Sequence, residues 1–190
     1  MTCITCWRTC RRFAESLALL TLMASASAAQ EVPVEALLHP AADSWPTYHG
    51  DYSGRHHSAL AQIAPANVKQ LTLAWAFQTN LAQSIKATPI LVNGIIYLSA
   101  PDNVWAIDAR DGTILWQYYW KTRGGTHIGN RGVGMWRNYL FVETPDDYLV
   151  KLDARTGKEM WHVEISPFEQ QYFSTMAPVI IRDHVIVGTG

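Results

Sequence analysis

Short apolar segments separated by turn residues dominate the chain from residue 87 onward. Residues 89–92 and 95–99 predict two strands, and Asn93-Gly94 between them favours a tight hairpin because both residues tolerate positive φ. Two further strands are expected over residues 104–107 and 113–118, each after a turn that contains aspartate. The pattern therefore predicts a small sheet of four antiparallel strands.

The same pattern returns along the chain. Residues 106–116 recur as residues 151–161, 45 positions later. Residues 92–98 recur as 136–142 and again as 181–187, at offsets of 44 and then 45. A period of about 45 residues with four short strands per unit predicts an all-β fold, a β-propeller of four-stranded antiparallel blades. About two and a half blades are expected here, and a β-sandwich would not explain the sequence repeat.

Tryptophans occupy equivalent places in the outer strand of the repeats. Trp116 and Trp161 match each other, and Trp75 lies in a similar place within residues 71–77, which predict a strand ahead of the first complete repeat. A ring this large can be buried between neighbouring blades with its indole N–H near a backbone acceptor. We therefore expect these tryptophans to be structural rather than to stack on a substrate.

Residues 1–29 have the features of a secretory signal peptide. Arginines precede an apolar stretch at residues 16–24, and small residues follow up to a cleavage point at Ala28 or Ala29. The apolar stretch is shorter than the roughly 20 residues that span a bilayer. An uncleaved anchor and a twin-arginine reading of Arg11-Arg12 remain alternatives. The expected location of the mature chain is the periplasm.

Composition narrows the class of protein further. The net charge of −1 provides no basic surface for phosphates, so we expect no nucleic-acid partner. All three cysteines lie within residues 1–29, so the mature chain would contain none. Residues 30–44 contain Pro and Ala without periodicity and predict a flexible N-terminal spacer. Residues 45–190 would then form the propeller domain.

Four stretches of the sequence resemble the quinoprotein alcohol and methanol dehydrogenases, which depend on pyrroloquinoline quinone (PQQ). They are residues 45–51, residues 130–133 followed by Trp136, residues 174–178, and the repeated Asp-Ala-Arg-x-Gly-x-x-x-Trp. The resemblance covers residues 45–190 and implies the N-terminal part of an eight-bladed propeller. It also implies PQQ at the propeller axis beside a calcium or lanthanide ion, with oxidation of an alcohol or sugar. The electron acceptor would be cytochrome c or a membrane quinone.

The resemblance places three cofactor-binding residues in this chain. Arg131 corresponds to an arginine that contacts the quinone, and Thr175 to a hydroxyl that binds a cofactor carboxylate. Lys86 stands where the family usually has a glutamate, and its ammonium could pair with a cofactor carboxylate. The alternatives are an ordinary ion pair, an ordinary strand residue and an exposed lysine. The family's adjacent cysteine pair is replaced by Gly125-Thr126.

No catalytic residue and no metal ligand can be assigned in this chain. The family's metal ligands and its base aspartate would lie beyond Gly190, and the histidines show no ligand spacing. We expect two blades and a fraction to leave sheet edges open when expressed alone. The missing cysteine pair and the charge of Lys86 leave a second hypothesis, a cofactor-free propeller that serves as a binding or assembly scaffold.

Overall fold

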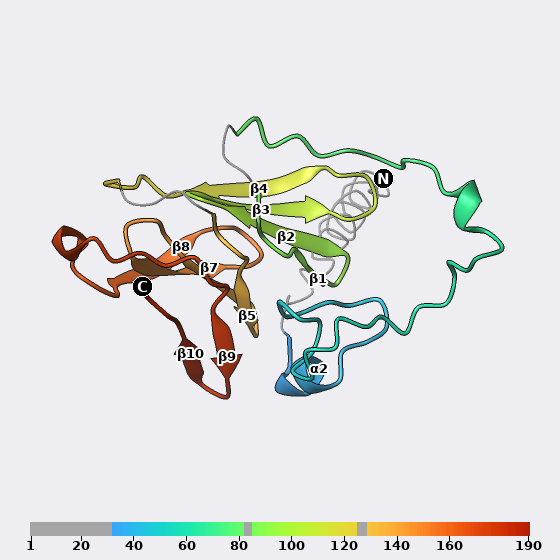
Figure 1. Ribbon diagram of the computed structural model, residues 1–190, viewed down its shortest axis with the longest axis horizontal. Helices are drawn as coiled ribbons and strands as arrows, with labels where there is room; N and C mark the ends of the chain where they lie inside the picture. Colours follow the sequence, from blue (N-terminus) through green and yellow to red (C-terminus); the bar gives the residue numbers. More distant parts are fainter. Residues whose placement is uncertain (1–31, 82–84, 125–128) are drawn as a thin grey trace, which may run out of the picture.

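The computed structural model describes residues 32–81, 85–124 and 129–190, so the predicted signal peptide lies outside the described residues. Two four-stranded antiparallel sheets stand beside each other, and a two-stranded hairpin lies next to the second sheet (Figure 1). Blade 1 contains β1 (Ile90–Val92), β2 (Ile95–Ala100), β3 (Asn103–Asp108) and β4 (Ile114–Tyr119). Blade 2 contains β5 (Gly134–Trp136), β6 (Tyr139–Glu143), β7 (Tyr148–Asp153) and β8 (Glu159–Glu164). Blade 3 contains β9 (Val179–Ile181) and β10 (His184–Ile186).

The strands of blade 1 begin and end within one residue of the predicted positions. The first hairpin is tight because Asn93 and Gly94 both adopt positive φ, at 51° and 74°. The register of the outer strand shifts between Ala106 and Ile107, and the same shift occurs between Lys151 and Leu152 in blade 2. The repeat is therefore conserved down to the position of a bulge, and the prediction of propeller blades is confirmed.

The main core fills the space between blades 1 and 2. Ile90, Tyr97, Leu140 and Val150 are buried there together, and each is fully shielded from solvent. The Tyr97 hydroxyl donates a hydrogen bond to the Ala154 carbonyl at 3.1 Å, which joins the two blades. Packing between the blades buries apolar side chains that an isolated four-stranded sheet would leave exposed.

Tryptophan side chains cross from one blade to the turn of the next. Trp116 donates its indole N–H to the Ala154 carbonyl at 3.0 Å, and its ring lies directly over Gly157. A Cβ at Gly157 would stand 2.6 Å from the ring, so the contact requires glycine. Trp75 makes the same pair of contacts one period earlier, over Gly112.

The strand expected at residues 71–77 is not formed. The segment passes along the outside of blade 1 without a hydrogen-bonded partner strand in the described part of the chain (Figure 1). Trp75 and Phe77 pack on the core around Trp105, whereas Leu73 is 82% exposed. Only the two aromatic side chains of the segment are partly buried, and a strand also needs a neighbouring strand to supply hydrogen bonds.

Residues 32–44, the described part of the spacer expected over residues 30–44, pack against the blades, which differs from the expectation of a flexible segment. Helix α2 (Val34–Leu38) lies in this stretch, and Leu37 is only 1% exposed within the main core. Val32 pairs with Arg137 as an isolated β-bridge. Val32 and Leu37 are both buried in the main core, although the stretch lacks periodicity. No helix in the described residues is both long and apolar enough to cross a membrane.

Candidate functional site

Three approach segments, the residues just before the innermost strand of each blade, lie next to one another. They comprise residues 86–89, 130–133 and 174–178. The Thr88 N–H donates to the Arg131 carbonyl at 3.0 Å, and the Arg131 N–H donates to the Thr175 carbonyl at 2.9 Å. These hydrogen bonds connect each blade to the next at one end of the propeller. Side chains that are distant in the sequence are thereby brought together.

The structure brings the three predicted cofactor-binding residues to this same end. Arg131 Nη1 donates a hydrogen bond to the Thr175 hydroxyl. The aliphatic part of Lys86 lies against Gly129, where an added Cβ would be 2.7 Å from the lysine Cδ. Lys86 and Arg131 are exposed, and neither forms an ion pair with an acidic residue in the described parts of the chain. The Arg131 guanidinium beside the Thr175 hydroxyl suits a ligand that carries carboxylate and carbonyl oxygens.

Asn130 holds the backbone on both sides of Arg131. Its side-chain oxygen accepts hydrogen bonds from the Ser99 hydroxyl at 2.5 Å and from the Gly132 N–H at 3.0 Å. Its amide group donates to the Glu143 carbonyl at 3.0 Å. Asn130 is 3% exposed, so these bonds are protected from water. In the Asn-Arg-Gly motif, the buried Asn130 therefore fixes the backbone and Arg131 presents an exposed positive charge. The sequence indicated a role for Arg131 alone.

Blades 2 and 3 approach closely beneath the site. A Cβ on Gly134, the first residue of β5, would lie 2.5 Å from the Pro178 carbonyl. Only glycine permits that spacing, because such a contact is far below van der Waals distance. The close approach fixes the distance between the segments that carry Arg131 and Thr175.

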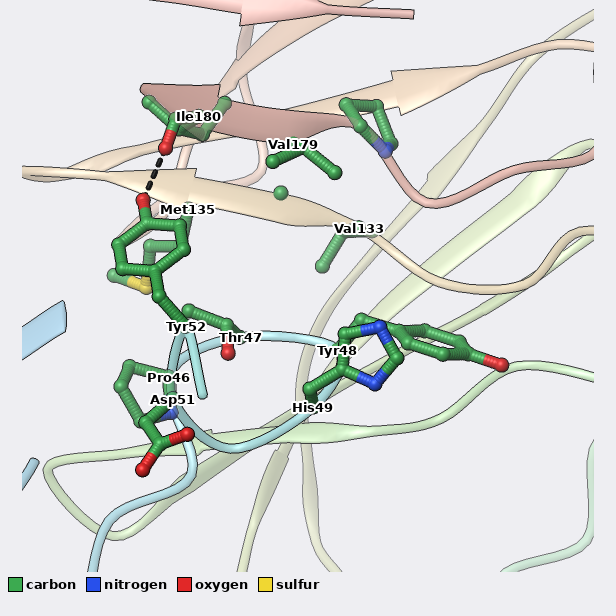
Figure 2. Close-up of a pocket in the computed structure, with 12 residues that line it drawn as sticks. Pro46, Thr47, Tyr48, His49, Asp51, Tyr52, Val133, Met135, Val179 and Ile180 are labelled. Carbon is green, nitrogen blue, oxygen red and sulfur yellow. Dashed lines mark hydrogen bonds between the residues drawn. The ribbon is translucent and has the colours of Figure 1, made fainter. Parts of the chain in front are cut away.

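The lead-in segment, residues 45–52, crosses the inner strands of the blades. Trp45 pairs with Leu91 in β1 through two backbone hydrogen bonds of 2.7 and 2.9 Å. At its other end the Tyr52 hydroxyl donates to the Ile180 carbonyl in β9 (Figure 2). A pocket of about 240 Å³ lies between this segment, β5 and β9. Lys86, Arg131 and Thr175 do not line it, so we do not assign the cofactor to this pocket.

A buried aspartate holds the loop that leads toward the site. Asp146 accepts hydrogen bonds from the Trp120 indole at 2.7 Å, the Thr144 hydroxyl at 2.7 Å and the Arg123 N–H at 3.0 Å. The loop continues into residues 125–128, so Gly125-Thr126, the replaced cysteine pair, lie outside the described residues.

Histidine and carboxylate groups do not form a metal site in the described residues. His49 Nδ1 and His56 Nε2 are 2.6 Å apart, a pairing that the sequence did not predict. No third histidine, cysteine or carboxylate joins them, and no cluster of three such groups occurs in residues 32–81, 85–124 and 129–190. The described residues therefore offer no cluster of such side chains to which the expected calcium or lanthanide ion could be assigned.

The repeated four-stranded sheets, their closely packed inner ends and the tryptophan contacts between them define a β-propeller. Residues 45–190 match the family model described as the glucose/ethanol/alcohol dehydrogenase β-propeller domain, a PQQ family. The chain belongs to this PQQ-dependent dehydrogenase family.

Individual relatives agree with this assignment. The chain is 40% identical to the quinohemoprotein alcohol dehydrogenase of Comamonas testosteroni over 154 residues. The matched region covers 76% of this chain and 22% of that protein. The structure of quinohemoprotein alcohol dehydrogenase ADHIIG from Pseudomonas putida superposes with a TM-score of 0.82 at 31% identity, over 87% of this chain and 26% of that one. A europium-containing methanol dehydrogenase superposes with a TM-score of 0.75 at 29% identity, over 80% of this chain and 28% of that one. The chain thus spans about a quarter of the length of these relatives.

Proposed function

We propose that the chain is part of a PQQ-dependent dehydrogenase that oxidises an alcohol or a sugar and passes the electrons to cytochrome c or a membrane quinone. The observation that carries this proposal is the convergence of Lys86, Arg131 and Thr175 at one end of three blades. The curated relatives that support it are alcohol dehydrogenases, and one is a 1-butanol dehydrogenase that uses cytochrome c. They favour an enzyme over a scaffold.

The residues of this chain fit one edge of a PQQ site. Bound PQQ supplies a quinone that accepts two electrons from the substrate. The planar Arg131 guanidinium can bind two of its oxygens at once, and the Thr175 hydroxyl can donate to a carboxylate. Lys86 adds a second positive charge on the neighbouring approach segment, residues 86–89. These residues bind and orient the cofactor.

Three finer features belong to the same proposal. The contacts of Trp75 and Trp116 with the following glycines support a tryptophan-docking motif that repeats around the propeller. The predicted signal peptide over residues 1–29 supports a periplasmic location. A calcium or lanthanide ion would act as a Lewis acid on the quinone and would need oxygen ligands.

Titration of the full-length protein with PQQ and calcium tests the proposal. We expect saturable binding at micromolar PQQ or below, together with oxidation of alcohols coupled to an electron-accepting dye. Without calcium, oxidation should fall while the protein stays folded. Absence of binding at micromolar PQQ, with the protein folded, would favour the cofactor-free scaffold.

A further inference from the structure

A buried carboxyl group lies directly behind the Arg131–Thr175 pair. Glu143, the last residue of β6, is 3% exposed. Neither of its carboxyl oxygens has a hydrogen-bond partner of normal geometry among residues 32–81, 85–124 and 129–190. An ionised carboxylate here would lose its hydration without compensating hydrogen bonds, which is a costly state in a protein interior. The position therefore favours the neutral acid.

The repeat shows that this acid is specific to the contact between blades 2 and 3. Ser99 and Gly188 occupy the equivalent positions in blades 1 and 3, at the offsets of 44 and 45 residues that relate the blades. Between blades 1 and 2 the Ser99 hydroxyl bonds to Asn130. Glu143 instead faces Ser174, which stands 44 residues after Asn130. A carboxyl thus replaces a neutral hydroxyl in the same contact between blades.

Burial is the main reason why Glu143 favours its protonated form. The hydroxyl of the neighbouring Ser174 donates its hydrogen to the Gly188 carbonyl at 2.5 Å. Burial, with a further contribution from the charge of Asp147 on the following turn, raises the pKa of Glu143 to about 8. The Ser174 side chain and, to a smaller extent, the Gly188 and Met176 amides lower the pKa and oppose this rise only in part.

We propose that Glu143 is a positioning residue for the cofactor-binding pair and acts as a neutral carboxylic acid between blades 2 and 3. This inference rests on the proposed function of Arg131 and Thr175. The Glu143 carbonyl binds Asn130, the residue before Arg131, and its carboxyl faces Ser174, the residue before Thr175. Ionisation places an uncompensated charge between the two segments, draws in water and separates Arg131 from Thr175.

The first test measures PQQ affinity of the full-length protein across pH 6 to 10, by quenching of tryptophan fluorescence. Glu143→Gln keeps the side-chain shape but cannot ionise, and Glu169→Gln is the matched control because Glu169 is exposed. We expect the wild-type dissociation constant to rise about tenfold as the pH passes 8, the size of effect given by loss of one hydrogen bond to a charged group. Glu143→Gln should keep the low-pH affinity, and Glu169→Gln should follow the wild type.

The second test needs no cofactor. The Arg131 amide bonds to the Thr175 carbonyl, so its hydrogen exchange reports directly on the contact between the two segments. After correction for intrinsic exchange, protection should fall above pH 8 in the wild type and stay constant in Glu143→Gln. Equal profiles in the two proteins would overturn the role of Glu143, even if PQQ binds. If protection of the Arg131 amide falls above pH 8 but the protein binds no PQQ, the role of Glu143 between the blades is supported and the proposed function is overturned.

Discussion

The guanidinium of Arg131 donates a hydrogen bond to the hydroxyl of Thr175, which lies 44 residues later and one blade further round the propeller. The backbones of the same two residues are also hydrogen-bonded, at 2.9 Å. Both side chains are therefore held in place before any ligand arrives. Pre-ordered side chains bind more tightly, because their conformational entropy has already been lost.

Replacement of Arg131 with lysine should weaken PQQ binding without unfolding the protein. Lysine keeps the charge but cannot make two parallel hydrogen bonds to one ligand. We expect a loss of about 1.5–3 kcal/mol, or roughly 10- to 100-fold in the dissociation constant. Fluorescence titration of the full-length protein measures it. Arg137→Lys, an exposed arginine on the β5–β6 turn, is the control, and equal affinities for the two variants would remove Arg131 from the site.

The contact between Trp116 and Gly157 should be essential for stability. Gly157 has φ +71°, and a Cβ there would be 2.6 Å from the Trp116 ring. Gly94 has φ +74° with nothing within 4 Å of an added Cβ. Gly94→Ala should cost about 1 kcal/mol of unfolding free energy from backbone strain alone. Gly157→Ala should cost about 1–3 kcal/mol more, because the ring must move.

Urea unfolding of the two alanine variants separates backbone strain from the steric clash. The double variant Trp116→Leu/Gly157→Ala, compared with Trp116→Leu alone, provides a second check, because the smaller side chain should relieve part of the Gly157→Ala penalty. Similar losses for Gly94→Ala and Gly157→Ala would show that the tryptophan contact does not constrain the blades.

Tyr118 and Glu159 should give an acid-sensitive link between blades. The Tyr118 hydroxyl donates to Glu159 Oε2 at 2.6 Å, and this bond is the largest cause of a pKa of Glu159 below its ordinary 4.5. A lowered pKa stabilises the fold above the ordinary value, and that stability is lost as the pH falls through the folded-state value. Tyr118→Phe should therefore cost about 1–2 kcal/mol at pH 7 and much less at pH 3.

Unfolding curves at the two pH values measure the effect of Tyr118→Phe. Tyr119→Phe is the control, since Tyr119 is 63% exposed and should change stability little at either pH. A loss from Tyr118→Phe that is the same at pH 7 and pH 3 would show that ionised Glu159 is not the acceptor.

Asp146→Asn should destabilise the loop at residues 120–124. Both carboxylate oxygens of Asp146 accept hydrogen bonds, and an amide can accept at only one of them. We expect a loss of about 1–3 kcal/mol and faster hydrogen exchange of the Arg123 amide. Asp183→Asn changes a side chain that is 85% exposed and serves as the control. Unchanged exchange at Arg123 would mean that the loop is held by other contacts.

The sequence repeat predicted the fold well because each blade needs the same tight turns and the same buried tryptophan, so these residues recur along the chain. Asn93-Gly94 predicted a tight hairpin, and both residues adopt the positive φ that such a turn needs. Trp116 and its equivalents predicted burial between blades, and Trp116 lies over Gly157. The strand expected around Leu73 is absent because strand formation depends on a partner as well as on the residues themselves.

The site was predictable only in part. Arg131, Thr175 and Lys86 came from a family resemblance, and their convergence depends on backbone hydrogen bonds that no local pattern encodes. Glu143 was missed because an acidic residue at a strand end usually faces solvent. When the repeats are aligned residue by residue, Glu143 stands where the other blades have Ser99 and Gly188. This difference between the repeats could have identified Glu143 from the sequence.

A structure of the full-length protein with PQQ is the most direct test of the central claim. We expect PQQ to lie at the blade end formed by the three approach segments. Its oxygens should be within hydrogen-bond distance of the Arg131 guanidinium and the Thr175 hydroxyl. PQQ bound elsewhere, for example in the pocket beside Tyr52, or bound without contact to Arg131 would contradict it.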